Sequence, residues 1–364
     1  MKLAYSGKKT KEEVMLGIDS GDFSFDKYPL NALLMGDNLS IMRAWLRKFP
    51  NNKVDLVYID PPFATNTVFR SGKERTSTIS SSKQDQVAYV DNLKGADFIE
   101  FLRERFILLR ELMSDSASIY LHIDYKIGHY VKVVMDEVFG IENFKNDISR
   151  IKCNPKNFSR YGYGNMKDML LFYTKTNRFV WNEPLVDRTK DEIKRLFSKT
   201  DSKGRYYTTN PLHAPGETVD GPTGQPWKGM SPPKGRHWRC APSVLDELES
   251  KGLIEWSKNG VPRKIIYADD YSKKKLQDIW EFKDGQNPLY PTQKNLEMLK
   301  TIVMASSNPG DVVLDCFCGS GTTLLAADEL NRNWIGIDAS GVAISVSKKR
   351  LSNSEFLLGG GMGC

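Results

Sequence analysis

The segment that ends at Asp338 restricts the fold more than any other part of the sequence. Residues 311–317 have the apolar composition of a buried strand, Gly319-Ser320-Gly321 forms a turn, and 322–330 has the apolar spacing of a helix. A second strand, 334–338, follows. Glycines between a strand and a helix let the backbone approach a ligand, and a carboxylate can accept hydrogen bonds from both ribose hydroxyls. This order predicts a nucleoside site in an α/β fold.

The same alternation of strands and helices runs through most of the chain before this segment. It favours a layered α/β fold with a largely parallel sheet. Gly140 follows one expected helix as a stop signal, and Thr292 precedes another as a candidate N-cap. Apolar periodicity predicts strands at 31–35, 54–59, 117–123 and 168–173, and helices at 39–49, 98–112, 130–139 and after Thr292.

Two segments interrupt this alternation. Residues 64–92 are rich in Ser, Thr and Gln with almost no apolar period, and so long a connection is usually functional or mobile. Its central part, 71–86, is either a functional flap or an unstructured insertion. Residues 188–284 instead accumulate Gly, Pro, Trp and basic side chains. We expect a separate, loop-rich module there.

The positive charge of the chain is concentrated in its middle. Residues 145–283 hold 27 lysines and arginines against 17 acidic residues, whereas the remainder holds 25 against 28. Such a block is the footprint of a surface that follows phosphates, although a solvated basic face is an equal alternative. Trp227 and Trp238 either accompany these contacts or anchor a small core. The candidate contacts to nucleic acid are Lys228, Lys234, Arg236, His237 and Arg239.

Composition excludes several classes of protein. With 364 residues, 40% of them apolar and 27% charged, the chain is globular and long enough for one large domain or two. It has no apolar run of about 20 residues, and its first 14 residues lack a secretory signal, so we expect no membrane partner. Five scattered cysteines indicate a reducing, cytoplasmic setting, in the bacterial cytoplasm or nucleoid. Cys316 and Cys318 lack the further ligands of a zinc site, so we expect no metal.

Asp60-Pro61-Pro62-Phe63 directly follows an expected strand and carries the second chemical signal. It therefore lies at the carboxyl edge of the sheet, where α/β proteins bind ligands. The carboxylate of Asp60 and the carbonyl of Pro61 can each accept one N–H from an exocyclic amine, and Phe63 can stack on a planar base. These acceptors would pull the amine nitrogen towards tetrahedral geometry and free its lone pair for attack.

The two signals, in this order, resemble the permuted, β-class DNA amino-methyltransferases. The segments Leu34-Met35-Gly36-Asp37-Asn38-Leu39 and Pro291-Thr292-Gln293-Lys294 are similar to further motifs of that family. The basic stretch 221–239 most resembles the modification subunits of type III restriction systems. The resemblance covers roughly residues 30–350. It implies a circularly permuted, Rossmann-like sheet with helices on both faces and an inserted target-recognition domain.

The resemblance also implies a cofactor, S-adenosylmethionine, and a role for each matching residue. Asp338 would hold the ribose, Asp37 would line the adenosine side, and Thr292 with Lys294 would meet the methionine carboxylate. Asp60 would lie against both the cofactor and the target base, with Pro61, Pro62 and Phe63 completing the catalytic motif. The loop expected to cradle the methionine part consists of Asp315, Phe317, Cys318, Gly319, Ser320, Gly321 and Thr322.

The resemblance divides the chain into five parts. The catalytic half of the methyltransferase domain would contain the mobile loop, and the target-recognition domain would separate it from the cofactor-binding half. The expected parts are an N-terminal extension (1–27), the catalytic half (28–187, with the loop 64–92), the target-recognition domain (188–284), the cofactor-binding half (285–351) and a tail (352–364).

Our favoured interpretation is a site-specific, base-flipping methyltransferase that modifies the N6 amine of adenine in double-stranded DNA. Aspartate at position 60 favours adenine in this family, and an N4-cytosine enzyme is the alternative. An inactive DNA-binding specificity subunit, an RNA methyltransferase and a nicotinamide dehydrogenase are weaker alternatives. A nicotinamide dehydrogenase would need a third glycine in the glycine loop, but Leu324 occupies that position. Candidate protein partners are a restriction endonuclease and a second copy of the chain.

Overall fold

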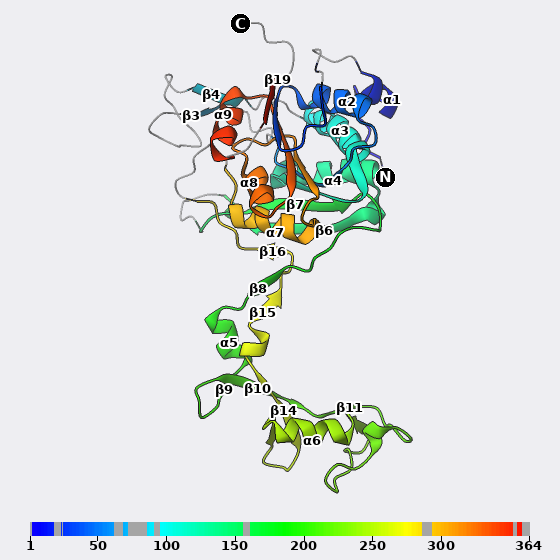
Figure 1. The fold of residues 1–364 in the computed structure, drawn as a ribbon, viewed down its shortest axis with the longest axis vertical. Coiled ribbons are helices and arrows are strands. Elements are labelled where there is room, and N and C mark those ends of the chain that lie inside the picture. Colours follow the sequence, from blue (N-terminus) through cyan, green and yellow to red (C-terminus); the bar gives the residue numbers. More distant parts are fainter. Residues whose placement is uncertain are drawn as a thin grey trace. The chain divides into compact units, whose positions relative to one another are not determined.

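The computed structural model describes residues 2–17, 23, 25–61, 68–71, 86–90, 95–155, 161–285, 293–351 and 355–358. Contacts within the chain separate two compact units (Figure 1). The large unit comprises Met1–Pro184 and Gln277–Cys364, and the small unit is Leu185–Leu276. The small unit thus begins three residues earlier and ends eight residues earlier than the module expected at 188–284. Its role in target recognition stays a prediction.

A nine-stranded sheet forms the centre of the large unit (Figure 1). Its strand order is β16-β6-β7-β5-β2-β17-β18-β1-β19. The neighbours from β5 to β19 pair in parallel, whereas β7 runs antiparallel to both β5 and β6. The strands are β1 (Ala32–Met35), β2 (Val54–Ile59), β5 (Met113–Ile123), β6 (Phe144–Ile151), β7 (Lys167–Thr174), β16 (Ile279–Trp280), β17 (Val312–Asp315), β18 (Asn333–Asp338) and β19 (Glu355–Leu358).

Helices cover both faces of this sheet, as predicted. On one face, Val57 and Ile59 of β2 share a core cluster with α2, α3 and α4. On the other face, α8 packs on β17 and β18, where Leu324 approaches Gly336 (Figure 1). The helices of the large unit are α1 (Lys11–Leu16), α2 (Asn38–Lys48), α3 (Gly95–Leu112), α4 (Tyr125–Phe139), α7 (Leu296–Ser306), α8 (Thr322–Glu329) and α9 (Gly341–Arg350).

The predicted strands and helices are confirmed, but several boundaries differ because of local capping. Helix α4 begins at Tyr125 rather than at 130, since the Asp124 side chain caps it, and it ends before Gly140 as expected. The prediction of Thr292 as the N-cap of α7 was wrong. The cap is Asn295, whose side chain accepts a hydrogen bond from the backbone N–H of Met298. Residue 292 itself lies outside the described residues.

The expected N-terminal extension folds onto the large unit. A capping box between Thr10 and Glu13 starts α1, and this helix packs against α3. Val14 is fully buried, and its carbonyl accepts a 2.6 Å hydrogen bond from Arg43 Nε. The segment 64–92 also contains structure that the sequence pattern did not predict, because β3 (Val68–Ser71) pairs with β4 (Gln86–Val90) in antiparallel fashion. Residues 72–85 lie outside the description.

The small unit contains a four-stranded sheet, and its core is built around two tryptophans. Trp227 and Trp238 are almost fully buried with Leu212 and Leu245. Their indole N–H groups donate to Asp246 Oδ1 and to a backbone carbonyl. The tryptophans therefore anchor a small core, which was one of the two roles expected for them. The elements of this unit include α5 (Lys190–Leu196), β9 (Lys199–Thr200), β10 (Tyr206–Pro211), β11 (His213–Pro215), β12 (Arg236–Trp238), α6 (Pro242–Ser250), β13 (Ile254–Trp256) and β14 (Pro262–Tyr267).

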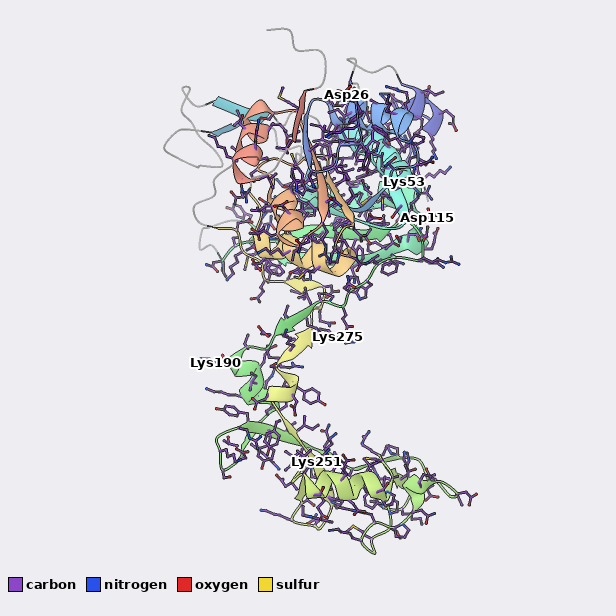
Figure 2. The ribbon with its side chains drawn as sticks, in the orientation of Figure 1. Asp26, Lys53, Asp115, Lys190, Lys251 and Lys275 are labelled. Carbon is purple, nitrogen blue, oxygen red and sulfur yellow. The ribbon has the colours of Figure 1, made fainter. Side chains whose placement is uncertain are left out.

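The two ends of the small unit lie side by side. β8 (Leu185–Asp187) pairs antiparallel with β15 (Lys273–Lys275), so the entering and leaving segments form one two-stranded ladder. Lys190, Lys251 and Lys275 mark α5, the end of α6 and β15 in Figure 2. Within the described parts of the whole chain, helices are too short or too polar to cross a lipid bilayer.

Candidate active site

Four carboxylates predicted from the sequence meet at one edge of the sheet. Asp315 and Asp338 end β17 and β18, Asp60 directly follows β2, and Asp37 follows β1. These four strands are neighbours in the order β2-β17-β18-β1 and run in parallel. Their carboxyl ends therefore lie at the same edge, which is where open α/β sheets bind ligands.

The glycine loop between β17 and α8 is held by the carboxylate that ends the next strand. Gly319 and Gly321 have φ angles of 50° and 72°, which side-chain-bearing residues rarely adopt. Asp338 Oδ2 accepts the N–H of Gly319 at 2.9 Å, and its Oδ1 accepts the N–H of Ser340 at 2.8 Å. A Cβ on Gly321 would lie 2.7 Å from Ser347 Oγ. Glycine is thus required where the loop packs closely on α9.

Burial perturbs both carboxylates beside this loop. Burial raises the pKa of Asp315 to about 7, although the Thr323 hydroxyl and the Phe317 N–H oppose the shift, and the charges of Asp60 and Asp338 add to it. Burial likewise raises the pKa of Asp338, against the N–H groups that it accepts. Clustered, desolvated carboxylates favour a cationic ligand, since a cation stabilises their ionised forms.

Asp37 has a structural role that the sequence analysis missed. Its Oδ2 accepts the N–H of Ser40 at 3.0 Å and so caps α2. Its Oδ1 forms a 3.1 Å ion pair with Arg105, which also binds the Asn38 side chain. Asn38 in turn donates to the Cys316 carbonyl at 2.7 Å. This chain of contacts fixes the loop after β1 against the loop after β17.

A cavity of about 360 Å³ lies beside this cap. Its walls come from the N-terminal segment and from the start of α2. The lining residues are Lys9, Glu13, Gly17, Asp37, Leu39, Ser40 and Arg43.

Asp60 has two oxygens in different surroundings. Oδ2 lies 2.7 Å from Lys294 Nζ, and the two side chains are only 16% and 11% exposed. Oδ1 is buried and has no hydrogen-bond partner among the described residues. The structure therefore brings Lys294 against Asp60, beside which Pro61 is buried. The other predicted members of this group, Pro62, Phe63 and Thr292, lie outside the described residues.

A buried polar network adjoins Asp60. Tyr58 Oη lies 2.9 Å from His122 Nδ1, and His122 Nε2 lies 3.1 Å from Asp168 Oδ2. Asp168 also contacts Lys152 Nζ at 2.6 Å and Arg150 Nη1 at 3.5 Å. An ionised Asp168 accepts the Nε2 proton, so Nδ1 is left to accept the Tyr58 hydroxyl. His122 is thus a hydrogen-bonded core histidine.

Electrostatics in this network follow from burial. Burial lowers the pKa of His122, and the positive charge of Lys294 lowers it further. Burial alone would raise the pKa of Asp168, but its bonds to His122 and Lys152 outweigh that effect and hold the pKa well below its usual range. Sequence reasoning did not single out Tyr58, Arg150, Lys152 or Asp168. A charged residue near the start of the otherwise apolar β7 was the available signal.

The cysteines beside the glycine loop are core thiols. Cys316 and Cys318 are 0% and 5% exposed, and burial raises the pKa of both thiols. A thiol held in its neutral form is a poor nucleophile and a poor metal ligand. Within the described part of the chain there is no group of three or more His, Cys, Asp or Glu residues suited to a metal ion.

The basic candidates of the small unit separate into two groups. Arg236 Nη1 lies 3.2 Å from His213 Nδ1, and burial together with Arg236, Arg239 and Arg263 lowers the pKa of His213. These arginines therefore form one cluster around β11 and β12. Lys228 is instead engaged in an ion pair with Glu249, and His237 Nδ1 lies 2.7 Å from the Gly216 carbonyl oxygen. For Lys234, the role in DNA binding rests on the sequence alone.

Comparison with known proteins identifies the family. The family model described as DNA methylase, of the N6/N4 type, matches residues 54–349. The chain belongs to this family. It is 41% identical over 359 residues to the type II methyltransferase M.EcaI of Enterobacter cloacae, covering 97% of this chain and 76% of that protein.

Two further relatives are more distant. The Mod subunit of the type III restriction-modification enzyme StyLTI of Salmonella typhimurium is 24% identical over 90% of this chain, which spans 54% of that subunit. A crystal structure of the M1.HpyAVI–SAM complex matches with 19% identity and a TM-score of 0.49, covering 88% of this chain and 99% of that one.

The family assignment confirms the predicted resemblance. The chain is a DNA methyltransferase of the N6/N4 family, related to enzymes of restriction-modification. The permuted order is also present, because β2 precedes β17 in the chain and lies beside it in the sheet.

Replacing Asp168 with asparagine should destabilise the large unit. The change removes the anion that faces Lys152 and, among the described residues, leaves Arg150 with only Asp284, and breaking such a buried pair typically costs about 3–5 kcal/mol. Denaturant unfolding measures the loss. Asp115→Asn is the matched control, because Asp115 is 88% exposed beside Lys175 and should change stability by less than about 1 kcal/mol (Figure 2). Equal losses in the two variants would contradict a supporting role for the network.

Asp315→Asn should change how stability depends on pH. The pKa of Asp315 is about 7 in the folded chain against 3.8 for an ordinary aspartate, so the folded state holds the proton more tightly. Wild-type stability is therefore lost as the pH rises from about 4 through 7, whereas the neutral asparagine is insensitive. We expect the melting temperature of the variant, measured relative to wild type, to be about a few degrees higher at pH 8 than at pH 5. An equal difference in melting temperature between variant and wild type at pH 5 and pH 8 would contradict the raised pKa of Asp315.

Proposed function

We propose that this DNA methyltransferase uses S-adenosylmethionine to methylate the N6 amine of adenine in duplex DNA. The observation that carries the proposal is the arrangement of Asp60. One carboxylate oxygen is fixed by Lys294, and the other is buried without a partner among the described residues. A buried acceptor without a donor costs roughly 1–3 kcal/mol, so this oxygen suits an N–H supplied by the substrate.

The described residues fit the cofactor at the glycine loop. Asp338 retains acceptor capacity for ribose hydroxyls, because each oxygen has more than one lone pair. The desolvated Asp315 favours the positive charge of a sulfonium ligand. Phe317 and the residues to Thr322 would surround the methionine part, with Asp37 on the adenosine side. When bound, the cofactor supplies the electrophilic methyl group that the amine nitrogen attacks directly.

The residues of the chain prepare the amine for this attack. Asp60 Oδ1 and the Pro61 carbonyl each accept one N–H, which draws the nitrogen towards tetrahedral geometry and directs its lone pair away from the ring. Phe63 would stack on the base. After transfer, the nitrogen is briefly cationic; Asp60 stabilises this charge and takes the surplus proton. Fixed geometry and exclusion of water supply the catalysis.

Adenine is favoured over cytosine by the residue type at position 60. Aspartate leans towards adenine in the family that the sequence resembles. An N4-cytosine enzyme is the alternative, because the same pair of acceptors serves any exocyclic amine. A catalytically inactive specificity subunit is disfavoured by the intact Asp60, Gly319, Gly321 and Asp338.

The target base must leave the duplex to reach Asp60, so base flipping is part of the proposal. The small unit would bind the flanking DNA through the cluster of Arg236, Arg239 and Arg263. A restriction endonuclease is a candidate partner, since the relatives include a subunit named for a restriction-modification enzyme. A second copy of the chain is the other candidate partner.

The direct test is transfer of labelled methyl from S-adenosylmethionine to unmodified duplex DNA, followed by nucleoside mass analysis. We expect N6-methyladenine. Asp60→Ala should lower the rate at least about 100-fold while S-adenosylmethionine binding, measured by calorimetry, stays nearly unchanged. Asp115→Ala is the control for a general effect of losing a carboxylate. Methylated cytosine would overturn the base assignment, and a retained rate in Asp60→Ala would overturn the proposed role of Asp60.

DNA binding should depend on salt through the arginine cluster. If Arg236 and Arg239 each neutralise one phosphate, replacing both with alanine should reduce the slope of log K against log salt by about 2. Lys251→Ala is the matched control, because Lys251 belongs to the same unit and pairs with Glu247 (Figure 2). Fluorescence anisotropy with a labelled duplex, over a range of salt, gives the slopes. An unchanged slope in the arginine variant would show that Arg236 and Arg239 do not neutralise phosphates and belong to a solvated basic face.

A further inference from the structure

The contact between Lys294 and Asp60 is an unusual feature of the candidate site. Both side chains are mostly buried, and the ammonium lies 2.7 Å from a single oxygen of the carboxylate. A charge-assisted hydrogen bond in such surroundings is stronger than a surface ion pair, because water screens it less. The contact leaves Oδ1 as the oxygen without a partner among the described residues. The two oxygens of Asp60 are thereby made inequivalent.

The backbone beside Lys294 is fixed by the start of α7. Asn295 Oδ1 accepts the N–H of Met298 at 3.1 Å, and its side-chain amide donates to the Lys283 carbonyl at 2.8 Å. Met298 and Leu299 are buried in the first turn of the helix. A capped helix with a buried first turn therefore sets the direction from which Lys294 reaches Asp60.

The other groups around the pair do not replace Lys294 as a cation. His122 of β5 is held neutral by burial, which lowers its pKa, with a further contribution from the charge of Lys294. Tyr58 of β2 is fully buried, and burial raises its pKa well above the usual value. Asp315, at the end of β17, carries the same charge sign as Asp60 when it is ionised, and burial raises its pKa to about 7. Among the described residues, Lys294 is thus the cation that contacts Asp60.

We propose that Lys294 is a positioning residue for methyl transfer, acting through Asp60. By holding Oδ2, it presents Oδ1 to the amine N–H. This inference rests on the proposed function, and it replaces the expectation that Lys294 binds the cofactor carboxylate. The two roles differ in the step that they affect. A positioning residue changes the rate of transfer, whereas a cofactor ligand changes the affinity for S-adenosylmethionine.

The test compares three purified full-length variants with wild type. Lys294→Met removes the charge at similar length, and Lys294→Arg keeps it. Lys300→Met is the control, on the helix α7 that follows Lys294, where Lys300 pairs with Glu297 and Glu329. Calorimetry gives the Kd for S-adenosylmethionine, and single-turnover transfer to unmodified duplex DNA at saturating cofactor gives the rate. Thermal unfolding shows that each variant is folded.

Lys294→Met should transfer methyl about 10- to 100-fold more slowly, with a Kd within about 3-fold of wild type. Lys294→Arg should recover part of the rate, and Lys300→Met should match wild type. A Kd that rises about 10-fold or more in Lys294→Met, with an unchanged rate at saturating cofactor, would overturn the inference and restore the cofactor role. Wild-type protein that binds the cofactor but transfers no methyl to DNA would overturn the proposed function itself, and the inference with it.

Discussion

Crowding of negative charge at one edge of the sheet is the constraint on which the rest of the large unit depends. The order β2-β17-β18-β1 places Asp60, Asp315, Asp338 and Asp37 at neighbouring strand ends. Each carboxylate is stabilised differently. Backbone N–H groups hold Asp338, Arg105 and a helix start hold Asp37, and Lys294 holds Asp60. Burial, with the charges of Asp60 and Asp338 adding to it, raises the pKa of Asp315 to about 7 despite the hydrogen bonds from Thr323 and Phe317.

Behind this edge, the antiparallel strand β7 supplies what the parallel strands do not. Its residue Asp168 carries a negative charge that His122, Lys152 and Arg150 surround. Arg150 also bonds to the Phe282 carbonyl and pairs with Asp284, shortly before the segment that leads to Lys294. The network therefore connects the buried residues beneath Asp60 to the segment that precedes Lys294.

Much of this arrangement could be predicted from the sequence, because it depends on local signals. The strands that precede Asp60 and the Gly319–Gly321 turn were evident from apolar runs and turn residues. The start of α7 was misplaced, since Thr292 and Asn295 are both good caps and only three-dimensional packing selects between them. The Tyr58–His122–Asp168 network depends on strand register between β2, β5 and β7, which no local pattern encodes. The pairing of Lys294 with Asp60 required the tertiary structure for the same reason.

The ladder of β8 and β15 has a consequence for how such proteins diversify. Because Leu185 lies opposite Lys275, the first and last residues of the small unit are neighbours in space. It also has its own core around Trp227 and Trp238. A cassette with neighbouring ends and an independent core can be exchanged by recombination without altering the order of the nine-stranded sheet. If the small unit recognises DNA and the large unit transfers the methyl group, as proposed, two recombination events at the ends of the small unit would give the same catalytic unit a new DNA target.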